Sequence, residues 1–370
     1  MSKIKLIHVG LGGWGSAWAR DVLPRHPDIE VAAYVDKDEA ALARAQAALS
    51  ISPDICFRDL AAALAGVRSD AVAICLPVPL HAPVAARALA ADKHVVVEKP
   101  FTATLREAHE LVRLAGERRR VLMASQNYRY FPAPILAAAL VREHGLGRLG
   151  QVKVDFRRNS MTRPHAYPEL AHPLLVDMAV HHYDLARMIL GEDPVEVTCR
   201  SWNPVGSPFA GDASGALTLT FPGGATLSYR GSWVDQARET SWAGEWQLDF
   251  ERGSVLFTSR SGRPNWRAQE RLWIKPLGGE PEPQHLPAVR LHGRRGVLAA
   301  FAAAIRTGAE PSAAFPSGRD NLGTLAVIEA SLASAASGGK PVRIADILAQ
   351  GESAAKGTEK PGPLKLGLRG

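Results

Sequence analysis

The chain has 370 residues, a length typical of two domains. A hydrophobic fraction of 46% and a charged fraction of 22% are those of a folded globular protein, and they exclude wholesale disorder. The formal net charge of +7 comes from lysine and arginine residues scattered along the chain, so we expect no nucleic-acid partner.

The three cysteines have no spacing typical of a disulfide framework, and we expect them to be reduced. No run approaches the roughly 20 apolar residues of a membrane helix. The first apolar stretch soon meets glycines, unlike the apolar core of a secretory signal. These features predict a cytoplasmic protein with no membrane segment.

Short apolar runs alternate with alanine-rich helical stretches at the start of the chain. This alternation predicts βαβ units and a parallel sheet covered by helices on both faces. The expected strands are 4–9, 30–35, 71–76, 94–97 and 121–124, and the expected helices are 16–23, 38–49, 82–91 and 105–118.

The pattern changes after about residue 150, where strand-like segments are joined by Gly/Pro turns. In 225–233, Leu227, Tyr229 and Trp233 alternate with polar residues, a period of two that is typical of an antiparallel sheet with unlike faces. The other expected strands are 151–159, 195–202, 216–221, 246–250 and 254–258, and the expected helices are 175–190, 297–307 and 319–337. The composition of 351–370 predicts a flexible tail.

A G-x-G-x-x-G motif directly follows the first expected strand and opens a helix. Gly10 permits a tight turn, Gly12 lets the backbone approach a pyrophosphate, and Gly15 lets helix and strand pack closely. The helix N-terminus presents free N–H groups to the phosphates. A glycine turn without a ligand is the alternative, but an acidic residue at the end of the second strand favours a dinucleotide.

That acidic residue is Asp36, about 20 residues after the last glycine. A carboxylate there accepts the ribose hydroxyls of NAD and repels the 2′-phosphate of NADP. NAD is therefore favoured, while the adjacent Lys37 leaves NADP open.

A Glu98-Lys99-Pro100 turn follows the fourth expected strand. The carboxyl end of a parallel strand lies in the crevice where doubly wound folds bind ligands. The proline restricts Lys99 to extended conformations and allows a cis bond. A surface turn with a solvated lysine is the alternative.

Polar residues recur in the expected helix 175–190. At 100° per residue, Asp177, His181 and Asp184 share one face, whereas His182 points away and is expected to pack or to bind a partner. A carboxylate and an imidazole one turn apart can orient one another, and the imidazole can exchange protons near neutral pH. A capped core helix is one alternative. A zinc site that includes His172 is another, but no HExxH motif or cysteine cluster accompanies it, so we expect no metal.

Together, these motifs resemble the glucose–fructose oxidoreductase/inositol dehydrogenase (Gfo/Idh/MocA) family. The resemblance extends to about residue 345, and it rests on the glycine loop, 76–81, 93–100, 127–130, 177–184 and the late helices 297–307 and 319–337. It implies a Rossmann doubly wound parallel sheet in a domain over 1–127. An α+β domain over 128–345 follows, with a large, mainly antiparallel, open-faced sheet. One face of that sheet would cover the nicotinamide and substrate, and the other would make a homodimer or homotetramer. Helix 319–337 is expected to pack back towards the first domain.

The resemblance also implies roles for individual residues. Lys99 is the expected active-site lysine, and Asp177 and His181 are expected to handle the substrate hydroxyl. The expected cofactor-binding residues are Gly10, Gly12, Gly13, Trp14, Gly15, Asp36, Lys37, Leu76, Pro77, His81, Glu98 and Asn127. The expected substrate-binding residues are Tyr128, Arg129, Arg163, His165 and Asp184.

These residues predict hydride transfer between a carbinol carbon and nicotinamide C4, with NAD as cofactor and a sugar, cyclitol or related polyol as substrate. His181 is the expected base, and Lys99 is expected to hydrogen-bond the reacting oxygen. Two alternatives share the scaffold: an NAD-assisted glycosidase without net redox change, and a non-catalytic regulatory protein that senses dinucleotides.

Overall fold

The protein is described from a computed structural model that covers residues 2–24, 26–161, 168–260, 270–310, 312 and 314–357. It divides into two compact units. Unit 1 comprises Met1–Asn127 and Leu291–Leu322, and unit 2 comprises Tyr128–Arg290 and Gly323–Gly370. The late segment 291–322, expected in the second domain, thus belongs to unit 1.

Unit 1 contains a six-stranded sheet in which neighbouring strands are parallel. Its strands are short and apolar, and every residue of the central strand Ala71–Ile74 is buried. Burial on both faces explains the continuous apolar runs in the sequence. In spatial order the strands are β3 (Cys56–Phe57), β2 (Ile29–Val35), β1 (Ile4–Val9), β4 (Ala71–Ile74), β5 (His94–Val97) and β6 (Leu122–Ala124).

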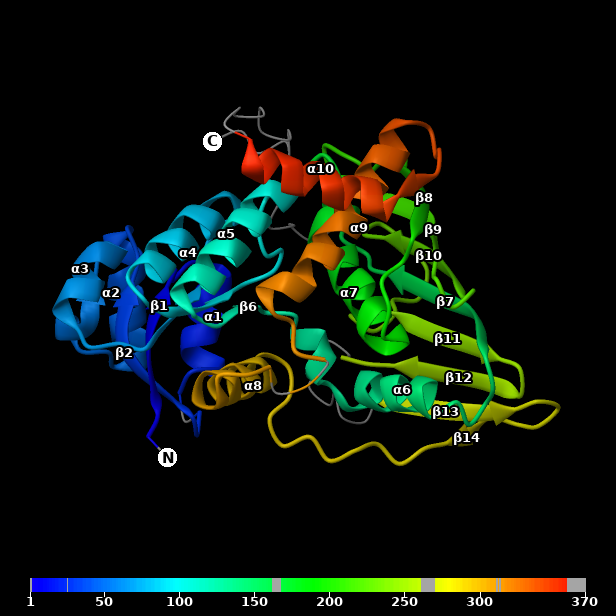
Figure 1. Ribbon diagram of the computed structural model, residues 1–370, viewed down its shortest axis with the longest axis horizontal. Coiled ribbons are helices and arrows are strands. Elements are labelled where there is room, and N and C mark those ends of the chain that lie inside the picture. Colours follow the sequence, from blue (N-terminus) through cyan, green and yellow to red (C-terminus); the bar gives the residue numbers. More distant parts are fainter. Residues whose placement is uncertain are drawn as a thin grey trace. The chain divides into compact units, whose positions relative to one another are not determined.

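Helices connect these strands, and α4 and α5 lie side by side in Figure 1. A capping box, in which the Thr104 side chain and Glu107 each bond the other's backbone N–H, fixes the start of α5. The helices of unit 1 are α1 (Gly13–Asp21), α2 (Glu39–Leu49), α3 (Leu60–Gly66), α4 (His81–Ala90), α5 (Leu105–Arg118) and α8 (Arg294–Thr307), with short 3₁₀ turns η1 (Pro53–Ile55) and η2 (Val78–Leu80).

Unit 2 contains a nine-stranded sheet in which only β7 and β10 pair in parallel. In spatial order the strands are β14 (Glu282–Pro283), β13 (Arg271–Pro276), β12 (Gly253–Thr258), β11 (Glu245–Phe250), β7 (Leu149–Arg157), β10 (Thr226–Ser232), β9 (Ser214–Thr220), β8 (Glu196–Trp202) and β15 (Val342–Arg343). This sheet and the parallel sheet of unit 1 confirm the expected fold class.

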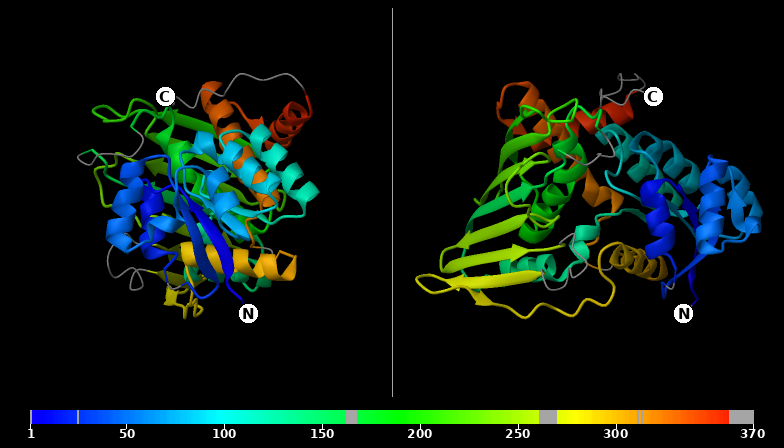
Figure 2. Two further views of the ribbon diagram at one scale, coloured as in Figure 1. Left: turned by 90° about the vertical axis from the view of Figure 1, so that its left-hand side faces the viewer. Right: turned by 180° about the vertical axis from the view of Figure 1, so that it is seen from behind.

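Figures 1 and 2 show α6 and α7 along one face of this sheet. The helices of unit 2 are α6 (Pro132–Glu143), α7 (Ala179–Leu190) and α10 (Ile344–Lys356), with the 3₁₀ turn η3 (Asn127–Tyr130) and the π-helical turn η4 (Leu174–Met178). The remaining helix, α9 (Gly318–Ala336), begins in unit 1 and continues in unit 2.

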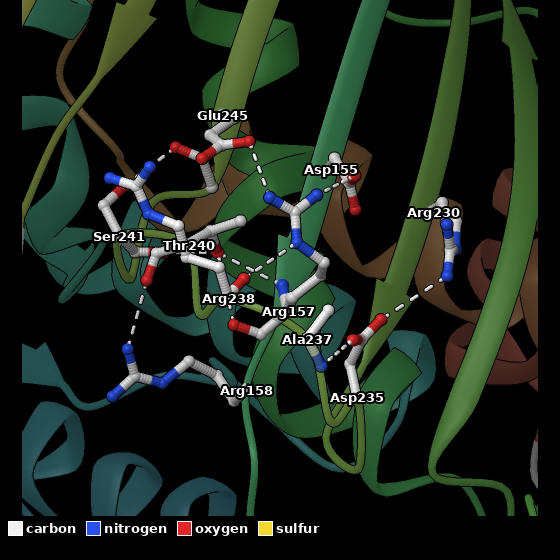
Figure 3. A network of polar contacts seen from close by, with 11 residues as sticks. Asp155, Arg157, Arg158, Arg230, Asp235, Ala237, Arg238, Thr240, Ser241 and Glu245 are labelled. Carbon is white, nitrogen blue, oxygen red and sulfur yellow. Dashed lines mark hydrogen bonds and ion pairs between the residues drawn. The ribbon is translucent and has the colours of Figure 1, made fainter.

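The face of the sheet away from α7 carries charged side chains. Phe156 of β7 packs on His182 of α7, so its strand neighbours Asp155 and Arg157 point to the other face. There the Arg157 guanidinium lies between the carboxylates of Asp155 and Glu245, bridging two strands (Figure 3). The nearby ion pair of Lys153 with Asp249, at 3.4 Å, continues this charged pattern.

Two expectations about local structure are corrected, and several elements were not expected at all. The predicted tail is wrong for residues 351–356, which complete the amphipathic α10; residues 358–370 lie outside the described residues. The predicted helix over 175–190 begins instead with the π-helical turn η4. Helices α3, α6 and α10 and the strands β3, β13, β14 and β15 were not predicted. No helix among the described residues has both the length and the hydropathy needed to cross a membrane.

Candidate functional site

The glycine loop has the backbone geometry that its sequence predicts. Gly10 has φ +100°, and a Cβ there would lie 2.2 Å from the carbonyl oxygen of Cys75. A Cβ on Gly15 would lie 2.0 Å from the carbonyl oxygen of Gly10, so both positions require glycine. Gly12 and Gly13 differ, since a Cβ on either would meet no atom within 4 Å. The loop is thus tight against the sheet and open on its outer side.

The open side of the loop is also the start of α1. Gly12 is the N-cap residue and offers no side-chain hydrogen bond, and the first turn contains no acidic residue. The first N–H groups of a helix have no partner within the helix and attract anions. The loop therefore fits the pyrophosphate of a dinucleotide.

Asp36 is fixed beside this loop. Its Oδ2 accepts a hydrogen bond from the Leu11 N–H at 2.6 Å, and its Oδ1 accepts one from the Asp38 N–H at 2.9 Å. The carboxylate is half-buried at the end of β2, whereas Lys37 is exposed. Asp36 thus presents a fixed acceptor next to the phosphate loop, where the ribose of a dinucleotide is expected.

Glu98 ties the lysine turn to the glycine-loop helix. It is buried; its Oε1 accepts from Trp18 Nε1 at 2.8 Å and from Ser125 Oγ at 3.3 Å, and its Oε2 accepts from the Lys99 N–H at 3.0 Å. The Lys99–Pro100 peptide bond is cis, as the sequence allows. Glu98 therefore fixes the backbone from which the half-buried Lys99 side chain extends.

His81 links two turns at the same sheet edge. Its Nδ1 lies 2.9 Å from the carbonyl oxygen of Pro100, and its Nε2 lies 2.8 Å from that of Leu76. Burial lowers the pKa of His81, against the opposing effect of these carbonyl groups. His81 and Glu98 thus have scaffold contacts that the sequence did not predict. The other expected cofactor residues from these turns differ in exposure: Leu76 is half-buried, Pro77 exposed and Asn127 buried.

His8, at the end of β1, was not singled out from the sequence. It is fully buried, its Nε2 lies 3.1 Å from the carbonyl oxygen of Gly15, and its ring meets Tyr34 edge-on at 5.9 Å. Burial lowers its pKa to about 4, so it is neutral near pH 7. The feature of the sequence that could have pointed to His8 is a histidine inside the apolar strand that directly precedes the glycine loop.

In unit 2, His181 stacks on Tyr128. The ring centroids are 3.9 Å apart and the planes differ by 1°. The guanidinium carbon of Arg260 lies 4.6 Å from the centroid of the same Tyr128 ring. Sequence reasoning assigned no role to Arg260, because nothing local connects it to residues more than 70 positions away in the chain.

Asp177 is half-buried on the π-helical turn η4. The Ala179 N–H bonds the Leu174 carbonyl there, an i→i+5 pattern. The angular argument that placed Asp177 on one face with His181 and Asp184 assumed a continuous α-helix, so it does not hold at Asp177. His181 and Asp184 lie on α7 itself.

Arg129 and Asp184 contact each other in the interior of unit 2. Arg129 Nε donates to Asp184 Oδ2 at 2.7 Å, and Nη2 donates to Oδ1 at 2.6 Å. Their side chains are 2% and 0% exposed, and Thr324 Oγ1 donates to Asp184 Oδ1 at 3.1 Å. This buried two-bond ion pair connects η3, α7 and α9.

Two expected substrate-binding residues, Arg163 and His165, lie outside the described residues. Of the zinc candidates, His172 has its Nδ1 3.5 Å from Asp212 Oδ2. Across the described ranges, no group of three histidine, cysteine or acidic side chains is placed to hold a metal ion. His182 packs inside unit 2, with Nδ1 3.1 Å from Tyr229 Oη.

Two protein-family models match this chain, one within unit 1 and one within unit 2. The model of the Gfo/Idh/MocA oxidoreductase family with an NAD-binding Rossmann fold matches residues 4–126, and the model of the Gfo/Idh/MocA C-terminal domain matches residues 135–256. An uncharacterized protein of Sinorhizobium fredii is 30% identical over 267 residues, covering 69% of this chain and 73% of that protein. D-apiose dehydrogenase of Paraburkholderia graminis is 29% identical over 324 residues, covering 84% of this chain and 82% of the relative.

Solved structures share the fold. The structure of an inositol dehydrogenase homologue from Azotobacter vinelandii, in complex with NADH and myo-inositol, has a TM-score of 0.79 at 19% identity. The match covers 92% of this chain and 98% of that one. At this identity the likeness concerns the fold alone.

Fold, loop geometry and comparisons define an NAD-dependent oxidoreductase. The chain belongs to the Gfo/Idh/MocA family.

Proposed function

We propose that this protein oxidises a secondary hydroxyl of a sugar or cyclitol, with NAD⁺ as hydride acceptor. The observation that carries the proposal is the Lys99 turn. The Glu98 carboxylate binds the Lys99 N–H at the carboxyl end of β5 and binds α1, the glycine-loop helix, through Trp18. A lysine fixed at this edge is suited to a substrate that reacts with a bound dinucleotide.

Bound NAD⁺ would supply the hydride acceptor at nicotinamide C4. The glycine loop and the α1 N-terminus would hold its pyrophosphate, and Asp36 its adenosine ribose. His181 takes the proton of the substrate hydroxyl, and Lys99 hydrogen-bonds the oxygen as it becomes a carbonyl. Asp177 orients the imidazole or holds a neighbouring hydroxyl.

Buried contacts support a scaffold role for the remaining expected residues. Glu98 and His81 hold the turns beside the cofactor, and the Arg129–Asp184 pair holds η3 against α7. Tyr128 acts on the substrate through its stack with His181. In this proposal none of these five side chains reacts with the substrate.

The polyhydroxylated substrate class is supported by the named relatives. The Paraburkholderia relative is a D-apiose dehydrogenase, and the Azotobacter structure contains myo-inositol. Both compounds carry several adjacent hydroxyl groups, so one hydroxyl can react while Asp177 binds its neighbour.

The test is a spectrophotometric screen of sugars, sugar acids and inositols with NAD⁺ and NADP⁺ in parallel. We expect reduced cofactor to accumulate in proportion to product, and His181→Ala and Lys99→Met each to lower kcat at least about 100-fold. His285→Ala and Lys275→Met, at exposed positions, are matched controls that retain activity.

Two outcomes would overturn the proposed reaction, and a third would overturn its residue assignment. Turnover without net cofactor reduction would identify an NAD-assisted glycosidase. Cofactor binding without turnover of any substrate class would favour a non-catalytic dinucleotide sensor. Unchanged turnover in both active-site variants would reject the assignment of Lys99 and His181.

A homodimer or homotetramer through the charged face of the unit 2 sheet is part of the proposal. Figure 3 shows carboxylates and guanidinium groups interspersed around Arg157, so this face carries both signs of charge. A surface with both signs can complement itself across a two-fold axis. Light scattering tests this, because Arg157→Glu should shift the protein towards monomer.

A further inference from the structure

An arginine from the late part of the chain stands over the glycine-loop helix. Trp14, the second residue of α1, is 45% exposed. The guanidinium carbon of Arg294 lies 4.6 Å from the centroid of the Trp14 ring and 6.0 Å from that of Trp18. Both distances are within the range of a cation–π interaction. Arg294 begins α8, which is outside the segment that matches the Rossmann family model.

The two arginines that open α8 meet opposite ends of α1. Arg295 donates to the carbonyl oxygen of Asp21, the last residue of α1, from Nε at 3.2 Å and from Nη2 at 2.8 Å. The C-terminal end of a helix carries partial negative charge, so this contact is favourable. Arg294 instead meets Trp14 at the N-terminal end, where the partial charge is positive.

Positive charge meets at the start of α1. The first turn of α1 contains no acidic side chain, and the N-terminus of a helix carries partial positive charge. Asp21, whose pKa is lowered chiefly by its hydrogen bond with Arg20 and also by the charge of Arg294, is the last residue of α1. A guanidinium and a helix N-terminus both attract anions, so together they can bind phosphate groups at the glycine loop.

Cys75 marks the carboxyl edge of the sheet next to the glycine loop. It directly follows β4, and its carbonyl oxygen is the atom that Gly10 closely approaches. Trp14 belongs to the same loop and helix start, so its contact with Arg294 places that arginine on this side of the sheet. The Cys75 thiol agrees with this position, because burial raises its pKa well above the ordinary value and the positive charge of Arg294 opposes that rise.

We propose that Arg294, held on the ring of Trp14, is a cofactor-binding residue whose guanidinium pairs with the pyrophosphate of NAD. The loop supplies backbone N–H groups to one side of the pyrophosphate, and Arg294 supplies a full positive charge from α8. A planar guanidinium suits this role because it can stack on an indole and donate two parallel hydrogen bonds to phosphate oxygens. The inference rests on the dinucleotide site of the proposed function and adds a residue from a separate segment of the chain.

The competing explanation is that Arg294 only packs α8 against α1. A packing contact would contribute to stability without distinguishing phosphate-bearing ligands from others. A phosphate contact would instead contribute to affinity and to its salt dependence, because counter-ions screen exposed charges.

The experiment measures binding of NADH, ADP-ribose and adenosine by calorimetry, at about 50 mM and about 500 mM salt. We expect Arg294→Met to weaken NADH and ADP-ribose binding about 10-fold to 100-fold, and to reduce the effect of salt. Adenosine binding should not change. Arg294→Lys, which keeps the charge but not the planar fork, should recover part of the affinity.

Arg295→Met is the matched control, since it removes the neighbouring arginine that bonds Asp21. It should bind NADH as the unmodified protein does, and thermal melting without cofactor checks that all variants fold. Unchanged NADH affinity in Arg294→Met, or an equal loss for adenosine, would overturn the inference. If the unmodified protein reduces NAD⁺ while Arg294→Met binds NADH equally well, the inference fails and the proposed function stands. If the unmodified protein binds no dinucleotide, both fail.

Discussion

The imidazole of His181 lies flat on the ring of Tyr128, with centroids 3.9 Å apart and planes 1° apart. The two residues come from different elements, η3 and α7, and both are buried. A parallel stack restricts rotation of the imidazole about χ2, so it fixes where the two ring nitrogens point. The base in the proposed reaction therefore depends on its aromatic neighbour for orientation.

We predict that Tyr128→Leu lowers kcat about 10-fold, because the imidazole loses the ring that orients it. Tyr128→Phe keeps the stack and should retain most of the activity. The stability lost with the aromatic pair should be only about 1 kcal/mol beyond the loss of buried area. Steady-state kinetics and denaturant unfolding of both variants check this, and equal kcat values for the Leu and Phe variants would contradict it.

We predict that Asp184→Asn destabilises the protein by about 3–5 kcal/mol, because it removes the carboxylate that pairs with the buried guanidinium of Arg129. Removing both charges with Arg129→Met and Asp184→Leu should cost less than the sum of the two single changes. Urea unfolding curves of the unmodified protein, Asp184→Asn, the two single variants Arg129→Met and Asp184→Leu, and their double variant give this comparison. Additive effects would show that the two side chains do not act as a pair.

The parallel domain was largely predictable because its signals are local. The boundaries of the Ile4–Val9 and His94–Val97 strands and of the Leu105–Arg118 helix match those expected from the sequence. Apolar runs, a capping threonine and glycines at fixed spacing act within a few residues of where they stand. The two-residue strands were missed because so short a run carries no periodicity.

The candidate site was less predictable because its contacts join distant segments. The sequence did not indicate that Arg129 and Asp184 bind each other, because a charge in a motif does not reveal a partner 55 residues away. The π-helical turn at Asp177 also escaped a prediction based on 100° per residue. Arg294 stands 280 residues after Trp14 and carries no motif, so only the structure connects them.

We predict that stability falls as the pH is lowered from about 6.5 to about 4, in part because of His8. Burial lowers the pKa of His8 from 6.5 to about 4, so across this window the unfolded chain binds a proton that the folded protein does not. Stability due to His8 is therefore fully present above pH 6.5 and is lost progressively as the pH falls, up to about 3 kcal/mol.

Denaturant unfolding at several pH values checks this prediction for His8. His8→Asn should reduce the pH slope of the unfolding free energy in this window by up to about 1.4 kcal/mol per pH unit. His94 and His182 also have pKa values lowered to about 4, so a residual slope from them is expected. An unchanged slope in His8→Asn would show that His8 is not buried and neutral in the folded protein.

We predict that Asp36→Ser shifts cofactor preference towards NADP⁺. The Asp36 carboxylate is anchored by the Leu11 N–H and so cannot easily turn away from a 2′-phosphate. Removing it should raise the ratio of kcat/KM for NADP⁺ to that for NAD⁺ about 100-fold, both by weakening NAD⁺ and by ending repulsion of the phosphate. Asp38→Asn is the matched control, because Asp38 caps α2 nearby and bonds the Ala40 N–H instead of the glycine loop. A strong preference of the unmodified protein for NADP⁺, or the same ratio in Asp36→Ser as in the control, would refute the role given to Asp36.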